Sequence, residues 1–388
     1  MDIKYCSFHE LEKESADKKI VLFGAGAIGA VIAPEILNDL GLLSRVEFII
    51  DNDPDKFGKI LEFHGRTIEI KSPPFLEKCG KDTIIILNVS RFSDVIDQLE
   101  KMFCTQYMTC YIMPALLINN YCSDKSGGEP VLTESPMIPK KLHYMWLGKK
   151  QIPDNLKRCI ESWRRYCPDY EVICWNEDNY DICKHLYMKQ AFEHKAYGFV
   201  PDYARLDILY NEGGFYLDTD VEIKRNIDNL RYQYAFCGVE KWQLINFGGL
   251  SGAVKGNKMI RKFIDARKDI MFIDNKGNQN RHTCGYYDTI LAIHEGYKIS
   301  GRTQTINNMN IYAYDYFHPY DYISGISNET QNTYSVHWFN GGWLDEKMKC
   351  ANYKSNKEYM NGIVRTLNDS EVPDEYNSRI YKIDRKAK

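Results

Sequence analysis

Two aspartates with one residue between them, Asp218 and Asp220, follow an apolar stretch at residues 215–217. Side chains alternate along a strand, so a strand that continued through this stretch would direct both carboxylates to the same face. Two convergent carboxylates suit a hard divalent cation, Mg²⁺ or Mn²⁺, which prefers oxygen ligands. Because such a cation neutralises a nucleoside diphosphate that leaves a sugar, the pair predicts metal-dependent sugar transfer. The alternative is a solvated strand end after an ordinary turn at Gly213 and Gly214.

The helix predicted before this strand carries two charged residues that share a face. It begins near Pro201, which suits a first helical position, and stops at Gly213. Asp202 and Arg205 are three residues apart on it. The fixed fork of donors on Arg205 could hold a diphosphate or a sugar hydroxyl, and Asp202 could accept hydrogen bonds from sugar hydroxyls. A surface ion pair, with Asp202 favoured by the positive end of the helix dipole, is the alternative.

Two tryptophans and a histidine are candidates to complete the site. Trp146 closes a strand expected at residues 141–146 and could stack on a nucleobase, a contact worth ~1–3 kcal/mol, although a core tryptophan is the alternative. His337 lies in a strand expected at residues 334–339 and could supply a third metal ligand as a neutral imidazole; a lone strand histidine is more often structural. The glycine-containing loop that follows would close over the site with Trp343 and exclude water.

The first third of the chain alternates strands and helices, which indicates a parallel sheet. Strands are expected at residues 18–23, 46–50 and 83–87, and a helix is expected after the first and the third of them. A Rossmann-like domain is therefore predicted over residues 1–122.

Three glycines of this domain form the pattern Gly-x-Gly-x-x-Gly between the first strand and its helix, namely Gly24, Gly26 and Gly29. Asp51 ends the second strand, where such folds place an acid against a ribose. These four residues are candidates for nucleotide binding. The alternative is that the glycines only permit close helix–strand packing and that Asp51 starts a turn.

The second part of the chain begins after a predicted linker at residues 123–137, which are polar and rich in turn formers. Strands at residues 141–146 and 171–175 alternate with helices, the first of them at residues 153–166. Residues 138–388 are therefore expected to form a second α/β domain with a C-terminal tail, and its chemistry should lie at the carboxyl ends of its strands.

Composition narrows the class of protein. The 388 residues are 44% hydrophobic and 27% charged, as in an ordinary globular protein, and the net charge of −3 gives no reason to expect nucleic acid as a partner. The twelve cysteines form no CxxC pair, which fits reduced thiols better than a zinc ribbon or a disulfide framework. No apolar run has the length of a signal-peptide core or a membrane span. We therefore expect a cytoplasmic protein with at most peripheral association with the inner face of the membrane.

The blocks at residues 138–148, 201–220 and 337–343 resemble the DXD-containing glycosyltransferases of family 32, which include bacterial capsular and surface polysaccharide transferases. The resemblance spans about residues 138–345 and leaves the N-terminal domain outside. It implies a GT-A fold for the second domain and transfer, with retention of anomeric configuration, from a nucleotide sugar. A UDP-sugar donor and a saccharide or lipid-linked saccharide acceptor are expected.

The same resemblance implies roles for individual residues. The donor's base would stack on Trp146, the donor sugar would be held by Asp202 and Arg205, the metal, ribose and diphosphate would be engaged by Asp218 and Asp220, and Trp343 would join the donor-binding residues. The chain departs from the family at residues 339–342, which replace the more usual His-Tyr and Ser-Trp pattern after His337. The third metal ligand therefore stays open.

Two other functions remain compatible with the sequence. One is an NAD-dependent oxidoreductase that uses the glycine pattern of the N-terminal domain and binds its substrate in the second domain. The other is a non-catalytic sugar-nucleotide-binding scaffold in polysaccharide assembly. Coupled NAD(H) binding and turnover would favour the first, and nucleotide-sugar binding without transfer would favour the second.

Overall fold

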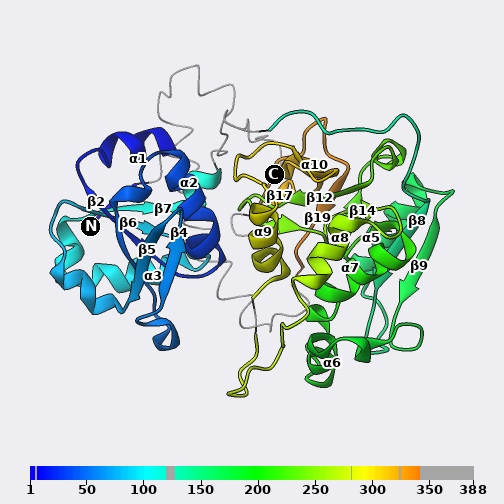
Figure 1. The fold of residues 1–388 in the computed structure, drawn as a ribbon, viewed down its shortest axis with the longest axis horizontal. Coiled ribbons are helices and arrows are strands. Elements are labelled where there is room, and N and C mark those ends of the chain that lie inside the picture. The colour runs from blue at the N-terminus through cyan, green and yellow to red at the C-terminus, as the bar shows by residue number, and fades with distance from the viewer. Residues whose placement is uncertain (5–6, 119–126, 281, 323–324, 341–388) are drawn as a thin grey trace.

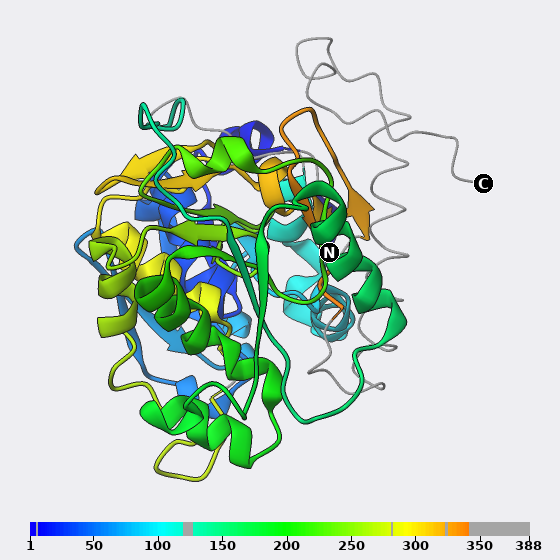
Figure 2. The ribbon, with the colours of Figure 1, turned by 90° about the vertical axis from the view of Figure 1, so that its right-hand side faces the viewer.

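The computed structural model describes residues 1–4, 7–118, 127–280, 282–322 and 325–340. Figure 1 shows two lobes side by side, each built around its own sheet with helices against it. We call residues up to 118 the N-terminal lobe and residues 127–340 the C-terminal lobe. Figure 2 views the molecule from the side of the C-terminal lobe, with the blue N-terminal lobe behind it.

The N-terminal lobe contains a sheet with the strand order β1-β7-β6-β2-β3-β5-β4. Its strands are β1 (Asp2–Lys4), β2 (Lys19–Phe23), β3 (Val46–Ile50), β4 (Ile60–Phe63), β5 (Arg66–Lys71), β6 (Thr83–Leu87) and β7 (Thr109–Ile112). All neighbours pair in parallel except β4 and β5. The central strands are buried runs of branched apolar residues, which is typical of parallel strands covered on both faces.

Helices pack around this sheet. They are α1 (Phe8–Glu14), a π-helical segment Ile28–Ile32 that continues into α2 (Ala33–Asp39), α3 (Phe92–Glu100) and α4 (Met113–Ile118). The predicted strands at 46–50 and 83–87 are confirmed, and the predicted α/β class with parallel-strand sheets is confirmed.

The C-terminal lobe contains a mixed sheet with the order β15-β16-β12-β14-β10-β8-β9 and β13 beside β12. Its strands are β8 (Lys141–Met145), β9 (Glu171–Trp175), β10 (Gly214–Tyr216), β12 (Ala235–Val239), β13 (Ile245–Asn246), β14 (Ser251–Ala253), β15 (Gln304–Ile306) and β16 (Met309–Tyr312). Small antiparallel pairs join β11 (Val221–Ile223) to β19 (Ser335–His337) and β17 (Tyr320–Asp321) to β18 (Ile326–Ser327).

The helices of this lobe are α5 (Asp154–Tyr166), α6 (Leu186–Glu193), α7 (Pro201–Glu212), α8 (Lys258–Asp265), α9 (Cys284–His294) and α10 (Tyr314–Phe317). Within the described ranges, no helix is both long enough and apolar enough to cross a membrane.

The described part of the predicted linker, residues 127–137, runs along the C-terminal lobe. The N–H of Gly128 donates to the carbonyl of Thr303 at 2.9 Å, and the N–H of Thr133 donates to the carbonyl of Tyr232 at 2.8 Å. This segment is therefore held by hydrogen bonds to the lobe that follows it.

The two lobes meet at α9, which lies on the side of the C-terminal lobe that faces the N-terminal lobe (Figure 1). The π-helical segment contacts α9, and Lys276 Nζ lies 3.7 Å from Asp55 Oδ1 across the same boundary. One apolar cluster contains buried residues of both lobes.

Candidate active site

Helix α7 places Asp202 and Arg205 in the interior. Pro201 occupies the start of the helix, and Gly213, with φ of +67°, ends it. The Arg205 side chain is 5% exposed, and its Nη2 lies 3.3 Å from Asp202 Oδ1. Because the pair is buried, the alternative of a surface ion pair is wrong.

Asp218 faces Arg205 from the loop after β10. Both carboxylate oxygens of Asp218 lie 3.2 Å from Arg205 Nη2. The N–H of Asp218 donates to the carbonyl of Gly248 at 2.8 Å, and a Cβ on Gly248 would come within 2.1 Å of Asp218 Oδ2. The neighbouring chain therefore needs glycine to let this carboxylate reach the guanidinium.

Asp220 faces a different partner. His337 Nε2 lies 3.3 Å from Asp220 Oδ1, and the N–H of Asn340 donates to Asp220 Oδ2 at 2.8 Å. The strand pairing of β11 with β19 brings these residues together, since Val221 lies opposite His337.

The charges of this pair support each other. Burial works against the charged form of Asp220, but His337 and the N–H of Asn340 hold the pKa of the carboxyl below its ordinary value. Burial also works against a charged His337, yet Asp220 raises the pKa of the imidazole above its ordinary value. The two side chains therefore form a buried, hydrogen-bonded ion pair.

The predicted alternation of Asp218 and Asp220 along a strand is wrong. Strand β10 ends at Tyr216, and residues 218–221 form a tight turn in which the N–H of Val221 donates to the carbonyl of Asp218 at 3.1 Å. After this turn the chain forms β11, which pairs with β19 outside the main sheet. Asp218 and Asp220 consequently contact different partners, Arg205 and His337.

Two of these residues form a donor set that fits a divalent cation. Asp220 offers carboxylate oxygen and His337 offers imidazole nitrogen, a combination suited to Mn²⁺ or Mg²⁺. Among the described residues, no group of three or more His, Cys, Asp or Glu side chains is arranged to hold a metal ion. Cations at diphosphate sites commonly use one or two protein ligands and complete their shell with water and phosphate oxygens.

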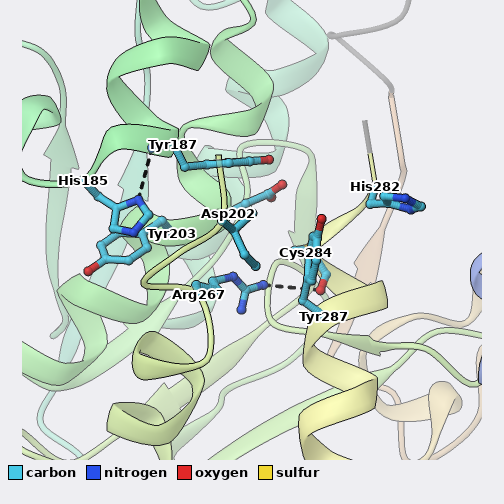
Figure 3. Close-up of a pocket in the computed structure, with 9 residues that line it drawn as sticks. His185, Tyr187, Asp202, Tyr203, Arg267, His282, Cys284 and Tyr287 are labelled. Carbon is cyan, nitrogen blue, oxygen red and sulfur yellow. Dashed lines mark hydrogen bonds between the residues drawn. The ribbon is translucent and has the colours of Figure 1, made fainter. Parts of the chain in front are cut away.

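A small pocket opens beside Asp202, as Figure 3 shows. The residues that line it are His185, Tyr187, Asp202, Tyr203, Arg267, Ile270, His282, Cys284 and Tyr287. Burial raises the pKa of Asp202 to about 6, although Arg205 and Arg267 oppose that change. Among the predicted site residues that the structure describes, Asp202 is the one that lines this pocket.

Three residues at or beside the pocket wall, Arg267, Cys284 and Asp288, are not predicted from the sequence. Arg205 Nη1 lies 3.3 Å from the sulfur of Cys284. Arg267 Nη2 donates to the carbonyl of Cys284 at 3.3 Å, as Figure 3 shows. Arg267 also forms a buried ion pair with Asp288. Cys284 and Asp288 are four residues apart in a helix, which is the one local signal they offer.

Trp146 does not line the pocket. It is half-buried, and its indole Nε1–H donates to the carbonyl of Lys150 at 2.6 Å. It packs against the apolar cluster beneath β8, so its stacking on a base stays a prediction. Trp343 lies outside the described residues.

The glycine pattern lies in the other lobe, away from the aspartates of the C-terminal lobe. Gly24 follows β2 directly, and Asp51 follows β3. Asp51 Oδ2 accepts a hydrogen bond from the N–H of Ala25 at 2.7 Å. The structure therefore groups Gly24, Gly26, Gly29 and Asp51 with one another.

Comparison with known proteins identifies a family match that includes α7, β10 and β11. Residues 153–237 match the family model for the glycosyltransferase sugar-binding region containing a DXD motif. The matched segment contains Asp202, Arg205, Asp218 and Asp220. It is therefore a glycosyltransferase-type region, although it makes up less than half of the chain.

Individual relatives are similar over part of their length. Inositol phosphoceramide mannosyltransferase 2 of Schizosaccharomyces pombe is 30% identical over 107 residues, which cover 26% of this chain and 30% of that protein. Subversion of eukaryotic traffic protein A of Legionella pneumophila is 25% identical over 174 residues, which cover 37% of this chain and 27% of that protein. The chain thus spans less than a third of the length of each.

Solved structures with some similarity also include glycosyltransferases. The PaToxG glycosyltransferase aligns with a TM-score of 0.32 and 20% identity, over 40% of this chain and 70% of that chain. An active-site mutant of LgtC aligns with a TM-score of 0.31 and 10% identity, over 62% of this chain and 99% of that chain.

Proposed function

We propose that this protein is a metal-dependent glycosyltransferase that moves a sugar from a nucleotide-diphosphate sugar to a saccharide or lipid-linked saccharide acceptor. The observation that carries the proposal is the buried guanidinium of Arg205, held between Asp202 and Asp218 inside the matched glycosyltransferase region. Burying a charge is costly unless it is paired, and a buried ion network is weak support for stability. Its retention next to a pocket is best explained by binding of a charged ligand.

Arg205 keeps an unpaired Nε–H and a weakly satisfied Nη1 for such a ligand. Its Nε is buried and has no hydrogen-bond partner. Its Nη1 contacts the sulfur of Cys284, a weak acceptor. A phosphate or sugar oxygen that entered here would satisfy these donors with a charge-assisted bond, and would gain more than the sulfur contact provides. Arg205 is therefore assigned to the donor's diphosphate or to the sugar beside it.

Asp202 is assigned to the hydroxyl groups of the donor sugar. Its carboxylate lies at the wall of the pocket, where hydroxyl donors would offset the cost of its burial. Asp218 orients Arg205 through contacts from both of its oxygens.

Asp220 and His337 are the residues that would hold Mn²⁺ or Mg²⁺, with Asp218 as a second carboxylate near the ribose and diphosphate. The cation supplies neutralisation of the charge that grows on the departing diphosphate. His337 must be neutral to serve as a ligand, so metal affinity should fall as the pH falls.

The finer parts of the proposal rest on the family resemblance. They are a GT-A fold for residues 138–388, retention of configuration, a UDP-sugar donor stacked on Trp146 and covered by Trp343, and a role in capsular or surface polysaccharide synthesis. A cytoplasmic location, with peripheral contact at the inner face of the membrane, is supported by the cysteines, which are free thiols throughout the described residues. Residues 1–122 are proposed as a separate Rossmann-like domain joined by the segment 123–137.

A panel of UDP- and GDP-sugars incubated with the protein and Mn²⁺ tests the proposal, with release of the nucleoside diphosphate and mass of the product as readouts. We expect one donor to turn over and a chelator to abolish the reaction. Asp220→Asn should lose about 100-fold or more in kcat, whereas Asp178→Asn, an exposed carboxylate paired with Lys149, should match the wild type. Absence of turnover with every donor and a broad panel of acceptors would refute the transferase assignment, and full activity of Asp220→Asn would refute the metal site.

A further inference from the structure

We propose that the loop after β2 is a second ligand site, distinct from the sugar-transfer site, which binds the diphosphate and ribose of a ribonucleotide. The first support is the strand order of the N-terminal sheet. Its parallel core reads β5-β3-β2-β6-β7, so successive strands run outward from β2 in one direction and then, from β6, in the other. In open parallel sheets of this kind, ligands bind beyond the carboxyl ends of the strands where the order reverses. Here that position lies between β2 and β6.

The three glycines differ in what the protein itself requires of them. Gly24 has φ of +106°, and a Cβ on it would lie 2.4 Å from Val89 Cγ1. A Cβ on Gly29 would lie 1.8 Å from the carbonyl oxygen of Gly24, so only glycine allows the helix to pack this close to the strand. Both glycines are explained by the fold alone.

Gly26 is not explained by the fold. Its φ lies outside the left-handed region, and a Cβ built on it meets no atom within 4 Å. Neither backbone strain nor internal packing therefore calls for glycine at this position. In dinucleotide-binding loops the middle glycine lets a diphosphate approach the backbone. The open space over Gly26 has the place in the fold that such a diphosphate would occupy.

An unpartnered buried acceptor lies at the foot of the same loop. Asn88 follows β6, is 2% exposed, and donates from its own N–H to the carbonyl of Phe23 at 2.8 Å. Its Nδ2 donates to the carbonyl of Ile86 at 2.9 Å, but its Oδ1 has no hydrogen-bond partner. The Cβ of Asn88 lies 3.1 Å from the place that a Cβ on Gly29 would take. A buried acceptor without a partner is destabilising, and a ligand hydroxyl or N–H at the switch point would satisfy it.

Asp51 selects the class of nucleotide. Its Oδ2 accepts from the N–H of Ala25 and from Lys56 Nζ at 3.0 Å, and its Oδ1 accepts from the N–H of Asp53 at 2.9 Å. A carboxylate offers about four acceptor positions, so one remains for a ribose hydroxyl. A phosphate on that ribose would be repelled by the carboxylate. The ligand is therefore a nucleoside diphosphate with a free ribose diol, either in a nicotinamide dinucleotide or in a nucleotide sugar.

Calorimetric titration of the full-length protein in chelator tests the site, with NAD⁺, NADP⁺, ADP-ribose and UDP-glucose as probes. All titrations are done in the Asp220→Asn background to weaken binding at the sugar-transfer site, and only the binding that Gly26→Ala removes is assigned to the loop after β2. We expect one of two patterns: either NAD⁺ and ADP-ribose bind, or UDP-glucose binds. In the first pattern NADP⁺ should bind more weakly than NAD⁺. The first pattern identifies a dinucleotide as the source of the diphosphate, and the second identifies a nucleotide sugar.

The decisive variant is Gly26→Ala, which adds a methyl group into open space and should leave the unfolding temperature unchanged. It should lower the affinity for the probe that binds by about tenfold or more. The same substitution in the otherwise wild-type protein should leave sugar transfer unchanged. Gly128→Ala is the matched control, because a Cβ there also meets nothing within 4 Å and Gly128 lies in the other lobe. Failure of all four probes to bind at millimolar concentration, or equal affinity in Gly26→Ala, would overturn the proposal. These outcomes are independent of whether any sugar is transferred.

Discussion

Arg205 is the residue on which the candidate active site depends. It is almost fully buried and contacts Asp202, Asp218 and Cys284 through the two ends of its fork. A lysine could keep the charge but offers a single ammonium in place of a planar fork. The geometry of the guanidinium, and not its charge alone, is therefore the feature that function should require.

Arg205→Lys is accordingly predicted to lower kcat/KM by about 100-fold, because the retained charge can no longer span both carboxylates and the donor. Steady-state kinetics with the accepted nucleotide sugar measures this change. Arg261→Lys is the control, since Arg261 forms an exposed pair with Asp265 and lies outside the site. An Arg205→Lys enzyme with near wild-type kcat/KM would remove Arg205 from the catalytic machinery.

Asp202 is predicted to make stability depend on pH. Its pKa is raised from 3.8 to about 6, mainly by burial, so the folded protein retains a proton that the unfolded chain has lost. A raised folded-state pKa gives stability that is complete below the unfolded value and is lost as the pH rises through the folded value. Asp202→Asn has no such proton, so its stability relative to the wild type should increase by about 1 kcal/mol between about pH 5 and pH 8.

Urea unfolding of both proteins at the two pH values measures this difference. In Asp202→Asn, the loss of the carboxylate beside Arg205 changes the free energy of unfolding by the same amount at both pH values. The change with pH in the stability difference between variant and wild type therefore reports the titration of Asp202. Asp269→Asn, whose side chain is 88% exposed, should run parallel to the wild type. A difference between Asp202→Asn and wild type that stays constant, or falls, with rising pH would contradict the assignment.

The candidate site residues were accessible from sequence, but their partners were not. Asp202, Arg205, Asp218 and Asp220 lie within twenty residues of one another, so motif and spacing predict them. The contact of Arg205 with Cys284 spans 79 residues and is created by the tertiary fold. The pairing of Asp218 with Arg205 and of Asp220 with His337 depends on where β10 ends, which alternation along an assumed strand did not reveal.

At the scale of elements, the junction between α7 and β10 fixes the position of the acidic turn. Gly213 and Gly214 both have positive φ, of 67° and 97°. A Cβ on Gly214 would lie 2.9 Å from the Cβ and the carbonyl oxygen of Lys141 in the neighbouring strand. Helix and strand can therefore join in so short a distance only because these residues lack side chains.

Gly214→Ala is predicted to destabilise the protein through two effects. The left-handed backbone costs about 1–2 kcal/mol for an L-residue, and the clash with β8 adds about 1–3 kcal/mol. Gly256→Ala separates the two, because Gly256 has φ of +73° but no atom within 4 Å of its would-be Cβ. Chemical denaturation should show a larger loss for Gly214→Ala than for Gly256→Ala. Equal decreases in the free energy of unfolding would mean that the added methyl group of Gly214→Ala does not clash with β8.

Element boundaries follow the sequence most closely where apolar periodicity is strong. The expected strands at 46–50, 83–87 and 171–175 coincide with β3, β6 and β9, and the expected helix at 153–166 begins one residue later as α5. The strand expected at residues 334–339 shortens to β19. Its length is set by pairing with the three residues of β11, and this partner lies more than a hundred residues earlier in the chain.

At the scale of the whole molecule, the sequence indicates two α/β units but not the contact between them. Residues 127–137 have the composition of a free linker, yet backbone hydrogen bonds hold them against the C-terminal lobe. Local sequence patterns also do not predict the contact of the π-helical segment with α9. Helix α9 thus contacts the π-helical segment of one lobe and, through Cys284, Arg205 of the other.

Because a single apolar cluster runs through both lobes and includes Ile32 and Ala292, we predict that the lobes unfold together in guanidinium chloride. All six tryptophans lie between residues 146 and 343, so their fluorescence reports on the second part of the chain alone. Hydrogen exchange of peptides from β2 and β6, followed by mass spectrometry, reports on the N-terminal lobe. The two transitions should coincide. Lys276→Ala should not separate them, because its pair with Asp55 is exposed and worth about 1 kcal/mol or less. Exchange of β2 and β6 at denaturant concentrations well below the fluorescence transition would show that the shared cluster does not couple the lobes.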